Sequence, residues 1–323
     1  MNAATDARKQ FERMTETPIP RLICSLAGPT MVSMLISAGY NLADTYFVGQ
    51  LGTSATGAVG VVFSLMAIIQ ALGFMLGMGS GGVISRFLGQ KRNTEAAQAA
   101  SSAFFTAIAV GFLIMIPGLI FSDGLMRLLG ATDTILPYAQ NYAQYILYGA
   151  PIMCATFVMN NDLRAEGKAF FSMIGIATGC VLNVFLDPLM IFTFHLGIAG
   201  AAIATVIGQS VSFVILIFNY IRHRTIVGIS AKYFSYKWSM HWEILRTGMP
   251  SFFRQGLASI ATIALNVSAA FYGDAAVAAM SIVGRSFFFI LSALLGFGQG
   301  FQPVAGYNYG AKCYARLKQA YWF

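Results

Sequence analysis

Long apolar stretches constrain the fold of this chain more than any other feature of its sequence. A helix needs about 20 apolar residues to cross a hydrocarbon layer roughly 30 Å thick, and several windows exceed that length. Only 10% of the residues are charged, against about 25% in an ordinary soluble domain. The sequence therefore predicts an all-α integral membrane protein, a polytopic helical bundle. The expected helices are 22–48, 57–85, 96–121, 138–158, 170–194, 197–220, 244–272 and 275–306.

Lysine and arginine are unevenly distributed between the helix links. They gather in the N-terminal tail and after the even-numbered helices, whereas the links after helices one, five and seven contain none. This is the positive-inside pattern, so we expect a multi-pass protein of the plasma (inner) membrane with a cytoplasmic N-terminus. The tail has no short apolar core with a cleavage site, which argues against a signal peptide. Topology explains the net charge of +8, and we expect no nucleic-acid partner.

Residues that often build enzyme sites or metal centres are scattered. Cys24, Cys154, Cys180 and Cys313 form no CxxC pair and have no nearby histidine cluster, which argues against a disulfide framework or a zinc site. The sequence contains neither GxSxG nor HExxH. We therefore expect a protein that is not an enzyme and carries no cofactor.

The chain contains an internal repeat. Sliding the sequence by 221 residues places Pro29 on Pro250 and Lys91 on Lys312 without a gap. Six expected helices separate the two copies, and an even number keeps both in the same orientation. This pattern predicts parallel repeats of the kind found in transporters.

The repeat also predicts the domain organisation. A complete second copy would give twelve helices, whereas the chain stops a few residues into the ninth. We therefore expect a C-terminally truncated chain that does not transport by itself. The expected parts are a cytoplasmic tail at 1–20, a complete six-helix N-terminal lobe at 21–221, a cytoplasmic linker at 222–243, and an incomplete second lobe at 244–323 with helices seven and eight and the start of nine.

Two carboxylates, Asp44 and Asp187, lie inside long apolar stretches. A charge at membrane depth costs roughly 2.5–3.5 kcal/mol even on a lenient scale, so such residues usually have a function. Counted from the expected outer turns, both aspartates and Thr205 lie at a similar depth, about 9–12 Å. Asn183 precedes Asp187 by one helical turn and shares its face. Taken alone, Asn183 or Thr205 would more simply be an interhelical polar contact, but the matched aspartates favour a site.

These four residues offer hard oxygen ligands. Asp44, Asn183, Asp187 and Thr205 would suit coordination of Na⁺, or a carboxylate pair that takes up a proton, and the sequence does not choose between the two. Pro188 directly follows Asp187, and we expect it to break the helix and to free a carbonyl for the same cavity.

Four motifs carry a resemblance to a known family. They are GYNLADTYFVG at 39–49, LRAEG at 163–167, Asn183-x-x-x-Asp187-Pro188, and QPVAGYNYGA at 302–311. In combination they resemble the multidrug and toxic compound extrusion (MATE) family, and within it the MepA-like branch. The resemblance extends from Pro18 to the last residue.

The resemblance implies a twelve-helix antiporter whose two lobes alternate access and expel small organic cations, driven by Na⁺ or H⁺. It places the cation site in the N-terminal lobe, at Asp44, Asn183, Asp187 and Thr205. The position equivalent to Asp44 in the second copy is Leu265, so coupling is expected in the first lobe only. We expect a monomer in the lipid bilayer. Candidates for lining the cavity or for gating are Pro29, Tyr40, Asn41, Gln302 and Arg285.

A different transport function stays open. An exporter or flippase of lipid-linked or anionic metabolites would share the bundle, and Arg285, about ten residues into its helix, would suit an anionic substrate better. A non-transporting membrane scaffold gives no reason for clustered aspartates.

Overall fold

The computed structural model describes residues 3–222, 224–270 and 274–323, and every regular element in these ranges is helical. The expected all-α fold is therefore confirmed. The elements are α1 (Ala3–Glu16), α2 (Ile19–Gly49), α3 (Thr53–Gly89), α4 (Asn93–Ile120), α5 (Ser122–Leu128), α6 (Leu136–Ala165), α7 (Ala169–Pro188), the π-helix η1 (Leu189–Thr193), α8 (Gly197–Ile221), the short 3₁₀-helix η2 (Ala231–Tyr233), α9 (Trp238–Ala270), α10 (Asp274–Gly310) and α11 (Tyr314–Trp322).

The eight expected transmembrane helices correspond to α2, α3, α4, α6, α7 with η1, α8, α9 and α10. Among the described residues, six helices are long and apolar enough to cross a membrane. α6 and α9 are not among the six. In α6, amide and tyrosine side chains lower the apolar character. The helices also run past the apolar segments that predicted them. α3 extends to Gly89 and α6 to Ala165, and α9 begins at Trp238 rather than at 244.

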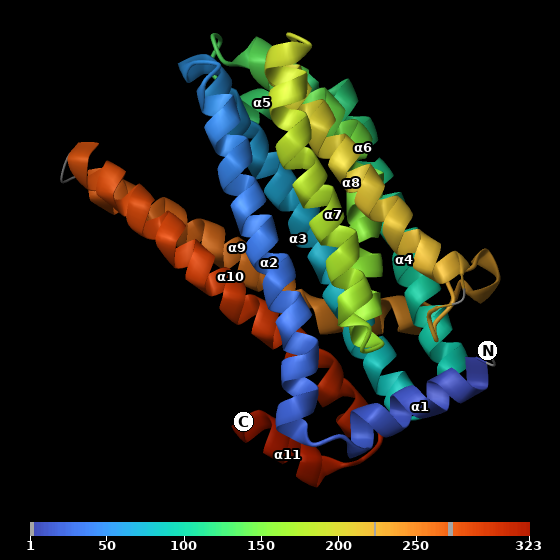
Figure 1. The fold of residues 1–323 in the computed structure, drawn as a ribbon. Coiled ribbons are helices and arrows are strands. Elements are labelled where there is room, and N and C mark those ends of the chain that lie inside the picture. The colour runs from blue at the N-terminus through green and yellow to red at the C-terminus, as the bar shows by residue number, and fades with distance from the viewer. Residues whose placement is uncertain (1–2, 223, 271–273) are drawn as a thin grey trace.

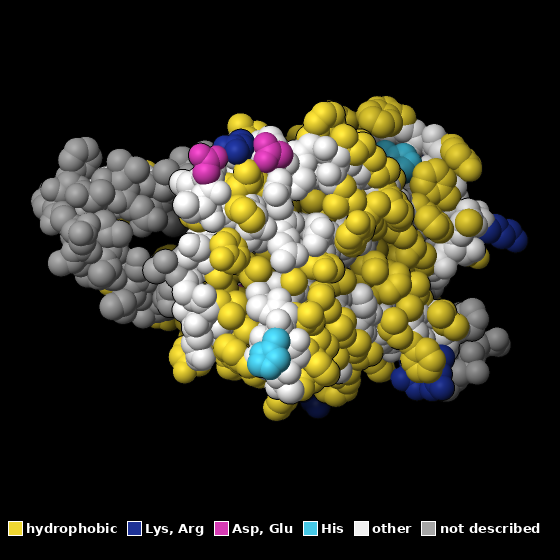
Figure 2. All heavy atoms as spheres, turned by 90° about the horizontal axis from the view of Figure 1, so that it is seen from above, with side chains coloured by type: hydrophobic (Ala, Val, Ile, Leu, Met, Phe, Trp, Pro, Cys, Tyr) yellow, Lys and Arg dark blue, Asp and Glu magenta, His cyan; other side chains and the backbone are white. Residues whose placement is uncertain are grey.

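The bundle has two distinct ends (Figure 1). We call the end at which α1 and α11 lie the α1 end; both chain termini lie there. The opposite end carries the α2–α3 turn, α5 and the α7–α8 turn. Viewed onto this opposite end, the surface is mainly apolar with few charged side chains (Figure 2). At the α1 end, by contrast, the Lys91 ammonium lies 4.6 Å from the centre of the Phe11 ring on α1. The predicted topology assigns the α1 end to the cytoplasm.

α9 and α10 pack against the first bundle near the α1 end and diverge from it towards the opposite end (Figure 1). The Thr30 hydroxyl of α2 donates to the Gly296 carbonyl of α10 at 2.6 Å. Earlier in α10, Phe287 is 63% exposed and Leu294 is 64% exposed. The two halves meet near the α1 end and separate towards the opposite end (Figure 1).

The repeat is visible in the backbone at equivalent helix ends and turns. α3 (Thr53–Gly89) and α10 (Asp274–Gly310) are each 37 residues long, and both their starts and their ends differ by the 221 residues of the sequence offset. Lys91 and Lys312 follow these helices with φ of 62° and 60°. A Cβ on Gly89 would collide with the Tyr307 carbonyl, and one on Gly310 with the equivalent Arg86 carbonyl. Such a reciprocal contact is what a two-fold relation between the copies produces.

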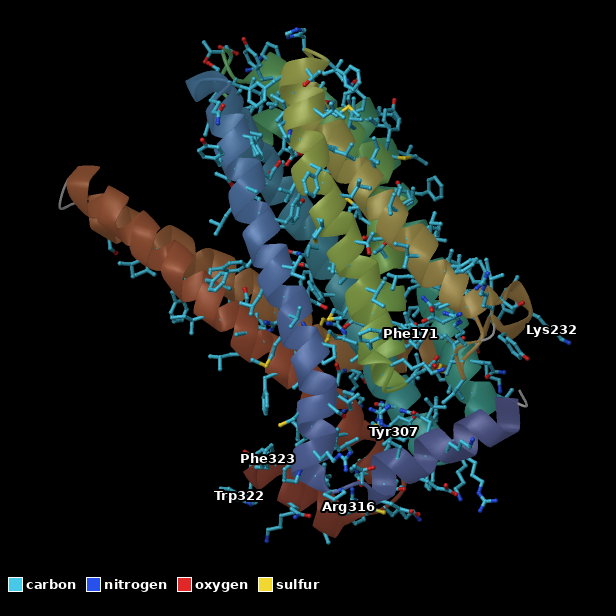
Figure 3. All side chains as sticks on the ribbon, in the orientation of Figure 1. Phe171, Lys232, Tyr307, Arg316, Trp322 and Phe323 are labelled. Atoms are coloured by element: carbon cyan, nitrogen blue, oxygen red, sulfur yellow. The ribbon has the colours of Figure 1, made fainter. Side chains whose placement is uncertain are left out.

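The N-terminal segment is a helix, although only a tail was expected from its charged composition. α1 lies across the α1 end, with Met14 fully buried. The Gln10 amide donates to the Glu166 carbonyl at 2.9 Å, and the Asn308 amide donates to the Met14 carbonyl at 3.2 Å. Arg316 of α11, labelled in Figure 3, donates to the Thr17 carbonyl at 2.6 Å. α1 therefore touches both copies of the repeat.

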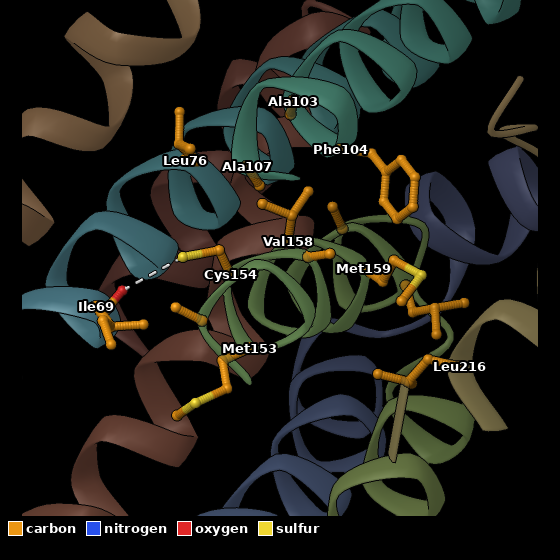
Figure 4. Packing of buried hydrophobic residues seen from close by; sticks show 14 of the residues in the cluster. Ile69, Leu76, Ala103, Phe104, Ala107, Met153, Cys154, Val158, Met159 and Leu216 are labelled. Atoms are coloured by element: carbon orange, nitrogen blue, oxygen red, sulfur yellow. Dashed lines mark hydrogen bonds between the residues drawn. The ribbon is translucent and has the colours of Figure 1, made fainter. Parts of the chain in front are cut away.

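α6 lies at the centre of the hydrophobic core (Figure 4). Cys154, Val158 and Met159 are fully buried, and the helix packs against α3, α4 and α8. The Cys154 thiol points at the Ile69 carbonyl of α3, 3.9 Å away. Because core packing fixes α8 against α6, and α7 against α8, it also fixes the helices that carry the candidate site.

Candidate functional site

The structure brings the two aspartates together on neighbouring helices. α2 carries Asp44 and packs against α7, which carries Asp187. Asp44 is half-buried and Asp187 is fully buried, and the two carboxyl groups are close enough to interact electrostatically. Two acids therefore lie within electrostatic range of each other inside an apolar bundle.

Four buried oxygens at this place accept no hydrogen bond from any described residue. They are Asp44 Oδ1, Asn183 Oδ1 and both carboxylate oxygens of Asp187. Buried polar atoms nearly always have partners, and a missing partner indicates strain, an ion or a functional role. The four atoms come from two helices that pack against each other, α2 and α7, so together they form an unused set of acceptors.

Asn183 and Thr205 complete the group from α7 and α8. Both are 2% exposed, and the Asn183 amide nitrogen donates to the Thr205 hydroxyl at 3.5 Å. The two helices approach closely because glycines face each other. A Cβ on Gly208 would lie 2.8 Å from the Gly179 carbonyl oxygen and 3.2 Å from Asn183 Cβ. The absence of side chains at Gly179 and Gly208 thus allows Asn183 to reach Thr205.

A small hollow opens beside Asn183 and Thr205. Its empty volume is about 160 Å³, and its enclosed part has room for about one water-sized particle. Asp44 and Asp187 are not among the residues that line it, so the carboxylates lie next to the hollow rather than in its wall. The lining residues are Tyr40, Gly179, Cys180, Asn183, Thr205, Gly208 and Gln209.

Two tyrosines border the group. Tyr40 of α2 and Tyr142 of α6 both lie next to Thr205 and within electrostatic range of the aspartates. Tyr40 was expected from the sequence, but Tyr142 was not. A signal existed, because Tyr142 lies about 9 Å along α6 from its start at Leu136, which matches the depth of Asp44. The position of Tyr142 along its helix was therefore sufficient to indicate it as a site residue.

The other candidate residues lie elsewhere or act locally. The Asn41 amide donates to the Ser37 carbonyl of its own helix at 2.8 Å, and its side chain is exposed. Pro29 lies in α2 beside Thr30, where α2 meets α10. The Gln302 amide of α10 donates to the Met78 carbonyl of α3 at 3.0 Å. These three residues are not gathered around the aspartates, and the side chain of Arg285 lies outside the described residues.

The helix is not broken after Asp187, contrary to the expectation from Pro188. α7 passes through Pro188 into the π-helix η1, in which the Phe194 amide donates to the Leu189 carbonyl at 3.0 Å. The proline removes one amide hydrogen, and the wider turns that follow absorb the misfit without opening the chain. The change of helix type begins directly beyond the acid.

The donor set fits a small cation or a proton. Carboxylate, amide and hydroxyl oxygens are hard ligands, and the described residues contain no cluster of three or more His, Cys, Asp or Glu side chains of the kind that holds a transition metal. Neutralising a buried pair of acids with a monovalent cation or a proton removes the cost of bringing two like charges together.

Comparisons with known proteins identify the family of the chain. A family model described as MatE matches residues 29–189 and 250–322. The multidrug export protein MepA of Staphylococcus aureus (strain MRSA252) is 30% identical over 302 residues, which cover 93% of this chain and 67% of MepA.

Solved structures are similar over nearly the whole chain. One is a MOP superfamily transporter from Pyrococcus furiosus, for which a reverse polarity of the binding pocket suggests a different function. It is 32% identical with a TM-score of 0.90, and the match covers 97% of this chain and 70% of that one. Another is an outward-facing multidrug resistance MATE family transporter of the MOP superfamily, 32% identical with a TM-score of 0.89 and the same coverage.

Proposed function

The chain belongs to the MatE family of multidrug efflux transporters, and from this premise we propose that it supplies the ion-coupling lobe of an antiporter that exports organic cations by alternating access. The coupling ion, Na⁺ or H⁺, binds at Asp44, Asn183, Asp187 and Thr205. The observation that carries the proposal is the set of four buried, unpartnered oxygens contributed by α2 and α7.

The coupling step follows from where these oxygens lie. A cation or proton between Asp44 and Asp187 replaces repulsion with attraction, which draws α2 towards α7. α2 also contacts α10 through Thr30, so a shift of α2 is transmitted to the second copy of the repeat. Ion binding thereby changes the space between the two halves, and a bound drug is released.

The divergence of α9 and α10 from α2 supports an assignment of this conformation. The halves meet near the α1 end and separate towards the opposite end (Figure 1). With the α1 end in the cytoplasm, as the basic links indicate, this arrangement is outward-facing. We propose a plasma (inner) membrane location, a cytoplasmic N-terminus and a monomeric state, with the lipid bilayer and small organic cations as the partners.

The test is ethidium efflux from cells that express the gene, with Na⁺ and H⁺ gradients imposed separately. Asp44→Asn and Asp187→Asn keep side-chain size and remove one charge each, and we expect both to abolish gradient-driven efflux. Asp123→Asn is the matched control, because Asp123 is an exposed acid of α5 that pairs with Arg127. Efflux equal to that of the unmodified protein in both site variants would contradict the coupling role.

The rival function is distinguished by the choice of substrate. If the protein is an exporter or flippase of lipid-linked or anionic metabolites, ethidium is not moved and an anionic fluorescent lipid is translocated instead. Export of organic cations that depends on the Na⁺ or the H⁺ gradient excludes the exporter or flippase function.

A further inference from the structure

The carboxyl-terminal end of α6 holds a second group of buried polar side chains, far from the candidate site. The group lies at the α1 end, whereas Asp44 lies near the opposite end of the bundle. Most of its members have clear partners. Asn160 donates to the Ser172 hydroxyl at 2.6 Å, and Glu166 accepts the backbone amides of Ile226 and Val227 at 2.9 and 3.1 Å.

Asp162 is the exception in this group. Its side chain is 0% exposed, and its Oδ2 atom has no hydrogen-bond partner among the described residues. Its Oδ1 atom lies 2.6 Å from the Ser80 hydroxyl of α3. No Lys, Arg or His in the described part of the chain forms an ion pair with it. An ionised carboxylate buried in this way has nothing to neutralise it.

The surroundings of Asp162 favour a neutral acid. Glu166, directly after the same helix, acts on Asp162 electrostatically, and a second acid nearby disfavours the ionised form of Asp162. Tyr220 of α8 also lies within electrostatic range of Asp162. Arg164 is two residues further along, so it projects from a different side of the helix. The Arg164 guanidinium donates to the Gln299 and Asn161 side chains instead.

The hydrogen bonds around Ser80 indicate which oxygen of Asp162 carries a proton. Its hydroxyl has one hydrogen but two acceptors within reach, Asp162 Oδ1 at 2.6 Å and the Gly77 carbonyl at 3.1 Å. With Asp162 ionised, only one of these contacts contains a hydrogen. With a proton on Oδ1, the acid donates to the Ser80 oxygen and Ser80 donates to Gly77, so both contacts become hydrogen bonds.

We propose that Asp162 and Ser80 form a proton-binding site at the α1 end of the bundle, separate from the Asp44–Asp187 site. A proton from water at this end forms an O–H bond with Oδ1 of the carboxylate, and the carboxylate loses its charge. Release returns the proton to water and leaves a buried charge between α3 and α6. The protonated form therefore belongs to the conformation in which the α1 end is closed, and loss of the proton favours entry of water there.

Infrared spectroscopy of the purified chain in lipid nanodiscs tests this directly. At neutral pH, the unmodified protein is expected to show a carbonyl band of a protonated carboxylic acid that is missing in Asp162→Asn. Asp123→Asn, an exposed acid, is expected to leave the carboxylic-acid region unchanged. Ser80→Ala keeps the acid and removes its partner, and it is expected to shift the band without abolishing it.

Two results would overturn the proposal. One is an unchanged carboxylic-acid region in Asp162→Asn together with the loss of an ionised carboxylate band. The other, decisive even where Asp162→Asn does not fold, is a spectrum of Ser80→Ala identical to that of the unmodified protein. The band is expected to persist in Asp44→Asn and Asp187→Asn. The experiment therefore tests proton binding at Asp162 independently of ion binding at Asp44 and Asp187.

Discussion

A single methyl group on α8 should disturb the candidate site without touching its chemistry. In Gly208→Ala, the new Cβ would lie 2.8 Å from the Gly179 carbonyl oxygen and 3.2 Å from Asn183 Cβ. To restore ordinary contact, α7 and α8 must separate by about 0.5 Å beside Asn183. Overpacking of this kind costs typically 1–3 kcal/mol of stability.

The same displacement should weaken ion binding. The Asn183–Thr205 hydrogen bond is already 3.5 Å long, at the limit of a useful interaction, and the separation would break it. If the broken hydrogen bond contributes about 1 kcal/mol to the binding free energy of the cation, its loss lowers the cation affinity roughly fivefold. Thermal unfolding and equilibrium titration with Na⁺ or H⁺, both in nanodiscs, measure the two effects.

Gly28→Ala is the matched control for this experiment. A Cβ on Gly28 of α2 meets nothing within 4 Å, so this variant should keep its affinity and lose no stability. The reasoning is refuted if Gly208→Ala binds and unfolds like the unmodified protein, because the close approach of α7 and α8 would then have no influence on the site.

Three further predictions concern other parts of the chain. Tyr142→Phe removes a hydroxyl next to Thr205 and should lower cation affinity roughly threefold to tenfold in the same titration, whereas unchanged affinity would remove Tyr142 from the site. Cys313, between α10 and α11, should react with an impermeant maleimide only in inside-out vesicles, and a cysteine placed at His195 only in intact cells; the reverse pattern would invert the topology. Burial raises the pKa of Glu166 above its usual value, so the folded state favours the protonated acid. Stability should therefore fall as pH rises from the usual value through the raised one, and Glu166→Gln should lose this dependence in thermal unfolding; an identical pH profile would contradict it.

The sequence predicted the repeat well because its landmarks have strict backbone roles. Lys91 and Lys312 occupy the same left-handed position after equivalent helices, and Pro29 and Pro250 occupy the same turn of theirs. Proline restricts the backbone as no other residue does, so it marks equivalent helix turns even where the apolar residues between the landmarks differ.

The aspartate site was predicted from depth, and depth alone is a one-dimensional measure. It placed Asp44, Asp187 and Thr205 at one level, but it could not say which helices are neighbours. Asn41, which shares that level, is exposed and bonds to its own helix. Only the packing of α2 on α7 and of α7 on α8 selects the residues that converge.

The polar end of α6 was missed for a different reason. Asp162 and Arg164 lie beyond the apolar segment at 138–158, where a sequence pattern predicts a solvated link. In the structure the helix continues to Ala165, and both side chains are buried against α3 and α10. Mean hydropathy reports how apolar a segment is, but not whether its polar face is turned towards protein or water.

The most direct test of the coupling site is equilibrium binding of the coupling ion to the purified chain. Radioactive Na⁺ binding and proton uptake would be measured in nanodiscs for the unmodified protein, Asp44→Asn, Asp187→Asn and the exposed-acid control Asp123→Asn. The four unpartnered oxygens predict one saturable binding event, for one of the two ions, that is lost in both site variants and retained in the control. Binding of equal affinity and stoichiometry in all four proteins would contradict it.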